Sequence, residues 1–147
     1  MKAREWHQRG KLAKDPIDAL TEFWRGFNNL FFPVKGRDER DKIRKFLVSE
    51  ISEKQAQDVL DGYKKEIGVL VAKPILDMRG NGRNTKTNIE AFDQAKDSLG
   101  KLQEVFMMVY QVRCNLEHGQ KSPNRKRDVE LCAAAFPIVG EIVGMKT

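Results

Sequence analysis

The sequence is poor in the side chains that form disulfides and bind zinc. Its 147 residues include two cysteines, Cys114 and Cys132, and two histidines, His7 and His118. The cysteines do not form a CxxC pair, so neither a disulfide framework nor a cysteine-rich zinc site is indicated. The four side chains are also too scattered for a structural zinc site of the usual spacing. We expect His7, among basic residues, to be exposed to solvent.

Long apolar stretches are also missing. No apolar run approaches the roughly 20 residues that cross a bilayer. The segment 1–15 contains no apolar block of the kind found in secretion signals. We therefore expect a cytoplasmic protein with no membrane partner.

Acidic residues are in the minority, and the resulting net charge of +6 is unevenly distributed. Five basic and two acidic side chains lie within residues 1–15. Further basic clusters lie at 79–86 and 121–127, in segments that we expect to be loops. Such clusters either bind phosphates or form ordinary solvated surface, and composition leaves both readings open.

Apolar spacing and capping residues predict an all-α protein. Asp15 and Pro16 are typical of a helix start, and the helix that follows should end at Pro33. Two more helices are predicted at 38–51 and 52–62.

The middle of the chain is less regular. Residues 63–78 fit either a short buried strand or a helix, of which we favour the helix, and Pro74 interrupts it. The segment 79–88 is rich in Gly and Asn, which predicts a mobile loop. A last helix is predicted at 128–143, bent or divided at Pro137.

The longest predicted helix covers residues 88–117 and would measure roughly 45 Å. Its segment 105–110 is apolar on every face, which is typical of the central helix of a bundle or of a helix shared with a second subunit. Gly119 should end this helix. These elements predict a bundle of about five helices, with a basic N-terminal arm at 1–15 and a single domain at 16–147.

Arg113 interrupts the apolar stripe of this long helix. A charged guanidinium on such a stripe is costly unless it has a partner or faces a wet cleft. Glu117, four residues on, could be that partner, or a phosphate could be gripped by the planar fork. The stripe consists of Phe92, Ala95, Leu99, Leu102, Phe106, Val109, Arg113 and Leu116.

His118 follows five residues after Arg113. On a straight helix the two side chains would diverge, whereas unwinding at Gly119 would allow them to approach. Histidine can exchange protons with a ribose hydroxyl or a leaving oxygen, and an arginine can neutralise a pentavalent phosphate. Alternatively, His118 only caps the helix end.

The segment "RCNLEH", followed by Gly119, resembles the Arg-x4-6-His motif of the HEPN domain superfamily. The helix "DALTEFWRGFNNLFF" also resembles the first helix of several HEPN groups. The resemblance covers residues 16–32 and 88–143, about half of the chain. Many active members carry Asn, Asp or His directly after the arginine, whereas this chain has Cys114, and Asn115 comes one place later.

The resemblance implies an all-helical endoribonuclease of the toxin or antiviral-defence type, a hydrolase that needs no metal and no cofactor. Two subunits would meet in a homodimer, with the long central helix at the interface and the Arg113 and His118 pairs forming one RNA-cleaving cleft. Arg113 would hold the scissile phosphate, and His118 would act as acid or base or contact the 2′-hydroxyl. Three residues would support the site: Asn28, Asn115 and Glu117. Seven would bind the RNA backbone: Lys121, Arg125, Lys126, Arg127, Arg79, Arg83 and Lys86.

Two other readings stay open. Cys114 favours a non-catalytic HEPN-like module that binds RNA, a nucleotide or a protein, for example a nucleotidyltransferase partner. An antitoxin is a further possible partner in a toxin-antitoxin pair. An unrelated helical adaptor would instead require Arg113 to be paired with Glu117 and buried away from His118.

Overall fold

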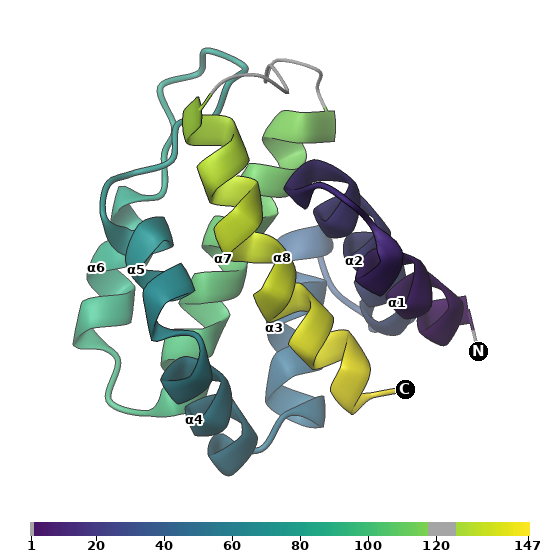
Figure 1. Cartoon of the computed structure of the whole chain (residues 1–147). Helices are drawn as coiled ribbons and strands as arrows, with labels where there is room; N and C mark the ends of the chain where they lie inside the picture. Colours follow the sequence, from purple (N-terminus) through teal and green to yellow (C-terminus); the bar gives the residue numbers. More distant parts are fainter. Residues whose placement is uncertain (1, 118–125) are drawn as a thin grey trace.

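A computed structural model describes residues 2–117 and 126–147. These residues form eight helices and no strand, which confirms the all-α prediction for the described chain (Figure 1). No helix among them is long and apolar enough to span a bilayer. The helices are α1 (Lys2–Leu12), α2 (Pro16–Phe31), α3 (Glu39–Glu50), α4 (Glu53–Gly62), α5 (Lys64–Val71), α6 (Lys86–Gln94), α7 (Ser98–Glu117) and α8 (Lys126–Met145).

Local capping signals account for the starts of the early helices. The Asp15 carboxylate caps α2 by accepting from the Asp18 amide at 2.9 Å, and Pro16 occupies the first turn. Ser52 and Gln55 form a reciprocal capping box at the start of α4, with bonds of 3.1 and 2.9 Å. Side-chain caps satisfy backbone N–H groups that a helix leaves without partners, so these boundaries follow from short sequence patterns.

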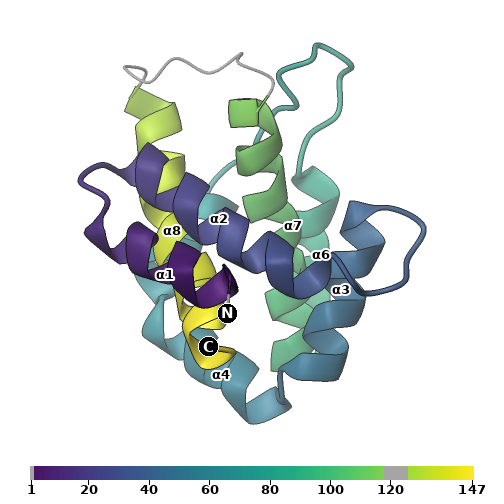
Figure 2. The ribbon, with the colours of Figure 1, turned by 90° about the vertical axis from the view of Figure 1, so that its right-hand side faces the viewer.

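The N-terminal segment contains a helix. Residues 2–12 of the predicted arm form α1, which makes a helical hairpin with α2 and also packs against α8 (Figure 2). Gly10 permits this close approach, because a Cβ there would lie 2.4 Å from the Phe23 ring. The exposed position expected for His7 is wrong: its half-buried ring packs against Phe23 with centroids 5.4 Å apart.

The predicted helix at 88–117 is two helices. Residues 95–97 separate α6 from α7, and the free amides at the start of α7 have side-chain acceptors. The Glu53 carboxylate accepts from the Ser98 and Leu99 amides at 2.8 and 2.9 Å, and Asp97 accepts from the Gly100 amide at 2.8 Å. These caps stabilise a second helix start, which a count of apolar spacing does not reveal.

The middle of α7 is the centre of the core. Residues Val105 to Val109 are at most 3% exposed, because α3, α4, α5, α6 and α8 all pack against this helix. The chain itself therefore buries the segment that is apolar on every face. Its composition no longer argues for an interface with a second subunit.

The remaining helices extend the bundle beyond the five that we predicted. Residues 64–71 form α5, as favoured for part of 63–78, and an extended stretch follows. Pro137 lies inside α8 without dividing it. With α1 and the division of the long helix, the described residues have eight helices instead of about five.

The loop between α5 and α6 is held by hydrogen bonds. Leu76 and Asn84 form an isolated antiparallel bridge, and the Asp77 amide donates to the Arg83 carbonyl at 2.9 Å. Gly80 and Gly82 have φ angles of 75° and 77°, which residues with a Cβ atom rarely adopt. The predicted loop is therefore present up to residue 85, as a turn with internal hydrogen bonds, and α6 begins at Lys86.

Candidate functional site

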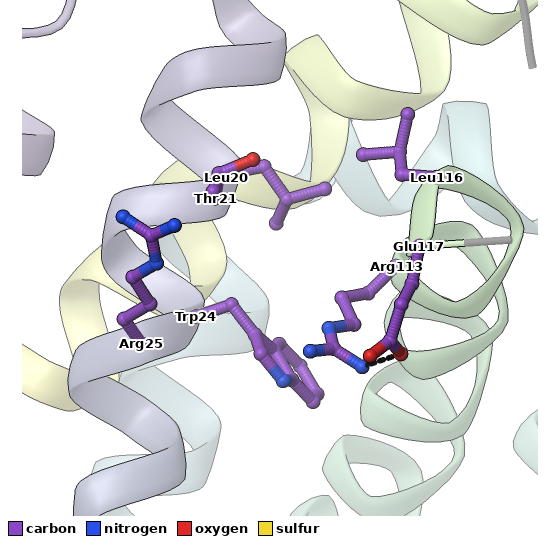
Figure 3. A pocket seen from close by; sticks show the side chains of 7 residues that line it. All are labelled: Leu20, Thr21, Trp24, Arg25, Arg113, Leu116 and Glu117. Carbon is purple, nitrogen blue, oxygen red and sulfur yellow. Dashed lines mark hydrogen bonds and ion pairs between the residues drawn. The ribbon is translucent and has the colours of Figure 1, made fainter. Parts of the chain in front are cut away.

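A cavity of about 280 Å³ lies between α2 and the C-terminal end of α7 (Figure 3). Its walls combine two arginines, an indole, a carboxylate and aliphatic side chains. They are Leu20, Thr21, Trp24 and Arg25 from α2 with Arg113, Leu116 and Glu117 from α7. The predicted motif arginine therefore lines a cavity instead of being sealed inside the apolar core.

Arg113 has two partners in this cavity. Its Nη1 atom donates to Oε2 of Glu117, and its guanidinium carbon lies 5.8 Å from the centroid of the Trp24 ring. The Arg113 side chain is 27% exposed and that of Glu117 55%. An exposed i,i+4 ion pair contributes only about 0 to 1 kcal/mol to stability. Glu117 therefore balances the charge of the Arg113 guanidinium but binds it only weakly. An incoming anion can compete with this carboxylate for the guanidinium.

Trp24 forms the aromatic wall of the cavity. It is 2% exposed and packs edge-on against Phe27 and Phe31 at 5.2 and 6.0 Å. Its Nε1 atom has no hydrogen-bond partner among the described residues. An indole face attracts a guanidinium, which helps to explain why Arg113 is tolerated at a stripe position.

Arg25 adds a second cation at the cavity. It donates to Glu22 at 3.1 Å and lies over the Trp6 ring at 5.0 Å. Its guanidinium points away from that of Arg113 in Figure 3. The sequence prediction included neither Trp24 nor Arg25 in the site, because their proximity to Arg113 depends on how α2 packs against α7.

The second catalytic candidate lies outside the described residues. This applies to His118 and to Gly119, at which the helix was expected to unwind, and also to the RNA-binding candidates Lys121 and Arg125. The description of α7 ends at Glu117, the residue directly before the histidine. The predicted approach of His118 to Arg113 stays a prediction.

Asn115 and Asn28 lie away from the cavity walls. The Asn115 amide is buried and connects α7 to the α5–α6 loop. Its oxygen accepts from the Met78 amide at 3.1 Å and its nitrogen donates to the Leu76 carbonyl at 2.8 Å. Asn28 is half-buried on α2 and forms no side-chain hydrogen bond within residues 2–117 and 126–147. Of the three supporting candidates, only Glu117 lines the cavity.

The other RNA-binding candidates are spread over several elements. Arg79 forms an ion pair with Asp77 at 2.8 Å, and its hydrogen bonds hold the pKa of that carboxyl well below the usual range. Arg83 and Lys86 are exposed at and just after the turn. Lys126 lies 4.0 Å from Glu130, and Arg127 donates to the Lys73 carbonyl at 3.3 Å. None of these five side chains lines the cavity of Arg113.

Cys114 follows the motif arginine and is half-buried against the hydrophobic core. Burial raises the pKa of its thiol, while Tyr110, Arg40 and Arg113 act in the opposite direction. Burial also raises the pKa of the Tyr110 phenol, whose hydroxyl donates to Glu39 at 3.3 Å. The thiol is therefore mostly protonated at neutral pH, when it is a poor nucleophile.

No group of three or more potential metal ligands occurs in the described part of the chain. Comparison with family models, with curated proteins and with solved structures finds no match for this chain. The functional argument therefore depends on the residues of the cavity and on the motif that ends α7.

Proposed function

We propose that this chain is a HEPN-like endoribonuclease that cleaves RNA through Arg113 and His118. The supporting observation is that Arg113 lines an open cavity at the end of α7, next to an indole and an exposed carboxylate. The pair with Glu117 is also what the helical adaptor requires, so the proposal depends on how exposed that pair is. Arg44 differs, because it forms two bonds of 2.8 and 3.2 Å to the buried Glu104.

Arg113 would bind the scissile phosphate in place of Glu117. A guanidinium can donate two parallel hydrogen bonds to a phosphate, and such charge-assisted bonds are stronger than those between neutral groups. Extra negative charge develops on the phosphoryl oxygens in the transition state, where a fixed cation lowers the barrier. The Trp24 ring supports the guanidinium from one side and limits its orientations.

His118 would transfer protons. As a base it takes the proton of a ribose 2′-hydroxyl while that oxygen attacks phosphorus, and as an acid it protonates the departing 5′-oxygen. The P–O5′ bond breaks as the P–O2′ bond forms, so the products are a 2′,3′-cyclic phosphate and a 5′-hydroxyl. The reaction needs a 2′-hydroxyl, so DNA is not a substrate.

We further propose that the active form is a homodimer in which two Arg113 and His118 pairs form one cleft. Toxin or antiviral-defence activity, an antitoxin or nucleotidyltransferase partner and a cytoplasmic location belong to the same proposal. Its support is the resemblance of "RCNLEH" and of the α2 segment to the HEPN superfamily. Activity measurements will show whether RNA is cleaved with Cys114 in place of the usual Asn, Asp or His.

The test is cleavage of labelled RNA by the purified chain and by three variants. Arg113→Ala and His118→Ala should each lower the cleavage rate at least 100-fold, the scale expected for loss of acid-base or electrostatic catalysis. Arg37→Ala is the matched control, because Arg37 is 86% exposed and does not line this cavity. Expression should also harm host cells, and His118→Ala should remove that effect. Intact RNA with all four proteins, without harm to cells, would contradict the proposal.

The second candidate is a non-catalytic HEPN-like binding module for RNA, a nucleotide or a protein partner. Cys114 is the observation that favours it, since its raised pKa leaves a mostly neutral thiol after the motif arginine. In that case RNA would bind and stay intact, and Arg113→Ala would weaken binding without any cleavage to lose.

A further inference from the structure

A second group of arginines lies around Tyr110 and Cys114. Tyr110, Arg113 and Cys114 are spaced by three and four residues, so they share one face of α7. The guanidinium carbon of Arg40, from α3, lies 4.7 Å from the centroid of the Tyr110 ring. The Tyr110 ring in turn lies 6.0 Å from the Trp24 ring, over which the Arg113 guanidinium lies at 5.8 Å. Two cations from different helices thus lie over neighbouring aromatic rings.

Arg79 joins them from the α5–α6 loop. It directly follows Met78, whose backbone amide donates to the Asn115 side chain of α7 at 3.1 Å. Its Nε and Nη2 atoms donate to Asp77 at 3.1 and 2.8 Å. Asn115 holds the neighbouring Leu76 and Met78 backbone against α7, so the loop has a defined place on this helix. We call Arg40, Arg79 and Arg113 the arginine patch.

Three carboxylates accompany the patch, and they leave donors available. Asp77 binds Arg79 through both oxygens, but Nη1 of Arg79 forms no hydrogen bond among the described residues. Glu39 accepts from the Tyr110 hydroxyl, and Glu117 is paired with Arg113. Arg40 is exposed and forms no ion pair within residues 2–117 and 126–147.

Arg44 shows by contrast how this protein satisfies a structural arginine. It lies one turn after Arg40 in α3 and is bound to Glu104 by two hydrogen bonds. Arg40 has an aromatic face beneath it and solvent above it. A cation placed over a ring keeps its edge N–H groups directed outward, where they can donate to an anion.

From this arrangement we infer that the arginine patch binds the RNA phosphates next to the scissile phosphate, with Arg40 and Arg79 guiding the strand to Arg113. The inference rests on the proposed ribonuclease function and adds Arg40 to the substrate-binding residues. Tyr110 is buried beneath Arg40, so the patch offers no open ring for a base to stack on. Recognition here is of the backbone and should be independent of base sequence.

The test uses a single-stranded oligonucleotide of 2′-O-methyl RNA, which cannot be cleaved through its 2′-oxygen. Binding is measured by fluorescence anisotropy over a series of salt concentrations. The variant is Arg40→Gln, and Arg37→Gln is the matched control. Arg37 lies three residues earlier, and Arg37→Gln removes the same charge. The Arg37 side chain, however, is 86% exposed and lies near Asp41 and not near Tyr110.

Arg40→Gln should weaken binding several-fold and reduce the slope of log K against log salt by about 0.7, the value for one phosphate contact with a single strand. Arg37→Gln should leave the slope unchanged. If Arg40→Gln also lowers the melting temperature, Arg40→Lys decides, because it restores the charge. Restored binding then supports the patch, and binding as weak as that of Arg40→Gln overturns it.

Failure of the patch and failure of the ribonuclease proposal give different results. Equal slopes for Arg40→Gln and Arg37→Gln overturn the patch, while cleavage of ordinary RNA by the unaltered chain still supports the enzyme. A slope change confined to Arg40→Gln, without cleavage of ordinary RNA, supports the patch as an RNA-binding surface and overturns the enzyme. A chain that binds no 2′-O-methyl RNA overturns the patch, and the cleavage assay then decides the enzyme separately.

Discussion

The middle of α7 and its C-terminal end are parts of one helix in two different environments. The middle is fully enclosed by neighbouring helices, and Phe106 and Met108 have no exposed surface. The end is covered on one side by α2 and carries Arg113 and Glu117 at a cavity. The middle therefore supplies stability, while the end supplies a charged surface whose partners can be exchanged.

Stability and binding should consequently respond to different substitutions. Changes in the middle should destabilise the fold and affect activity only through unfolding. Changes at the end should have small effects on unfolding and larger effects on anion binding. Three substitutions test this contrast, from the most destabilising to the least.

The largest effect is expected for Phe106→Ala. Phe106 is fully buried, and its ring centroid lies 5.1 Å from that of Phe27 on α2. Removing a buried ring loses its apolar transfer energy and leaves a cavity, which together cost about 3 to 5 kcal/mol. Urea unfolding measures the loss, and Phe32→Ala is the control because Phe32 is 65% exposed. Equal losses for both variants would show that the middle of α7 is not the core.

An intermediate effect is expected for Asn115→Ala, at the boundary between the two regions. The substitution leaves the Met78 amide and the Leu76 carbonyl without their side-chain partner. A buried polar group without a partner costs about 1 to 3 kcal/mol. Urea unfolding should show a loss in that range, and hydrogen exchange at the Met78 amide should become faster.

The matched control for Asn115 is Asn28→Ala, which removes a half-buried amide that forms no side-chain hydrogen bond in the described chain. It should change unfolding by less than about 0.5 kcal/mol, as surface substitutions usually do. Unchanged protection of the Met78 amide in Asn115→Ala would mean that this side chain does not hold the loop.

Much of the fold could be predicted from the sequence where its cause is local. The starts of α2 and α4 were predictable, because their caps lie within three residues of the groups they satisfy. The break before α7 was missed: Glu53, 45 residues before Ser98, supplies part of its cap, and the local Asp97 cap was overlooked. Apolar spacing continued through residues 95–97 and so predicted one helix where there are two.

The candidate site shows the same distinction. Arg113 could be identified because a charge at a stripe position is a local anomaly, and its pairing with Glu117 follows from their spacing on one helix. Trp24 and Arg40 could not be assigned to it, because they come from α2 and α3 and meet α7 only through packing. Asn115 was predicted near the site from its place in the motif, but its side chain faces the α5–α6 loop.

The smallest effect on stability is expected for Glu117→Gln, at the end of α7. The exposed ion pair with Arg113 contributes about 0 to 1 kcal/mol, so urea unfolding should change by no more than that. Binding of 2′-O-methyl RNA should nevertheless become a few-fold tighter, because a neutral amide competes with the phosphate for the guanidinium less well than a carboxylate does.

The matched control is Asp58→Asn, which removes the carboxylate of another i,i+4 pair. The Asp58 and Glu117 side chains are 56% and 55% exposed. Asp58 lies on α4, away from the cavity, so its loss should change RNA affinity only through net charge (Figure 1). Equal gains in affinity for both variants would mean that Glu117 does not compete at Arg113 and that the end of α7 has no special role in binding the anion.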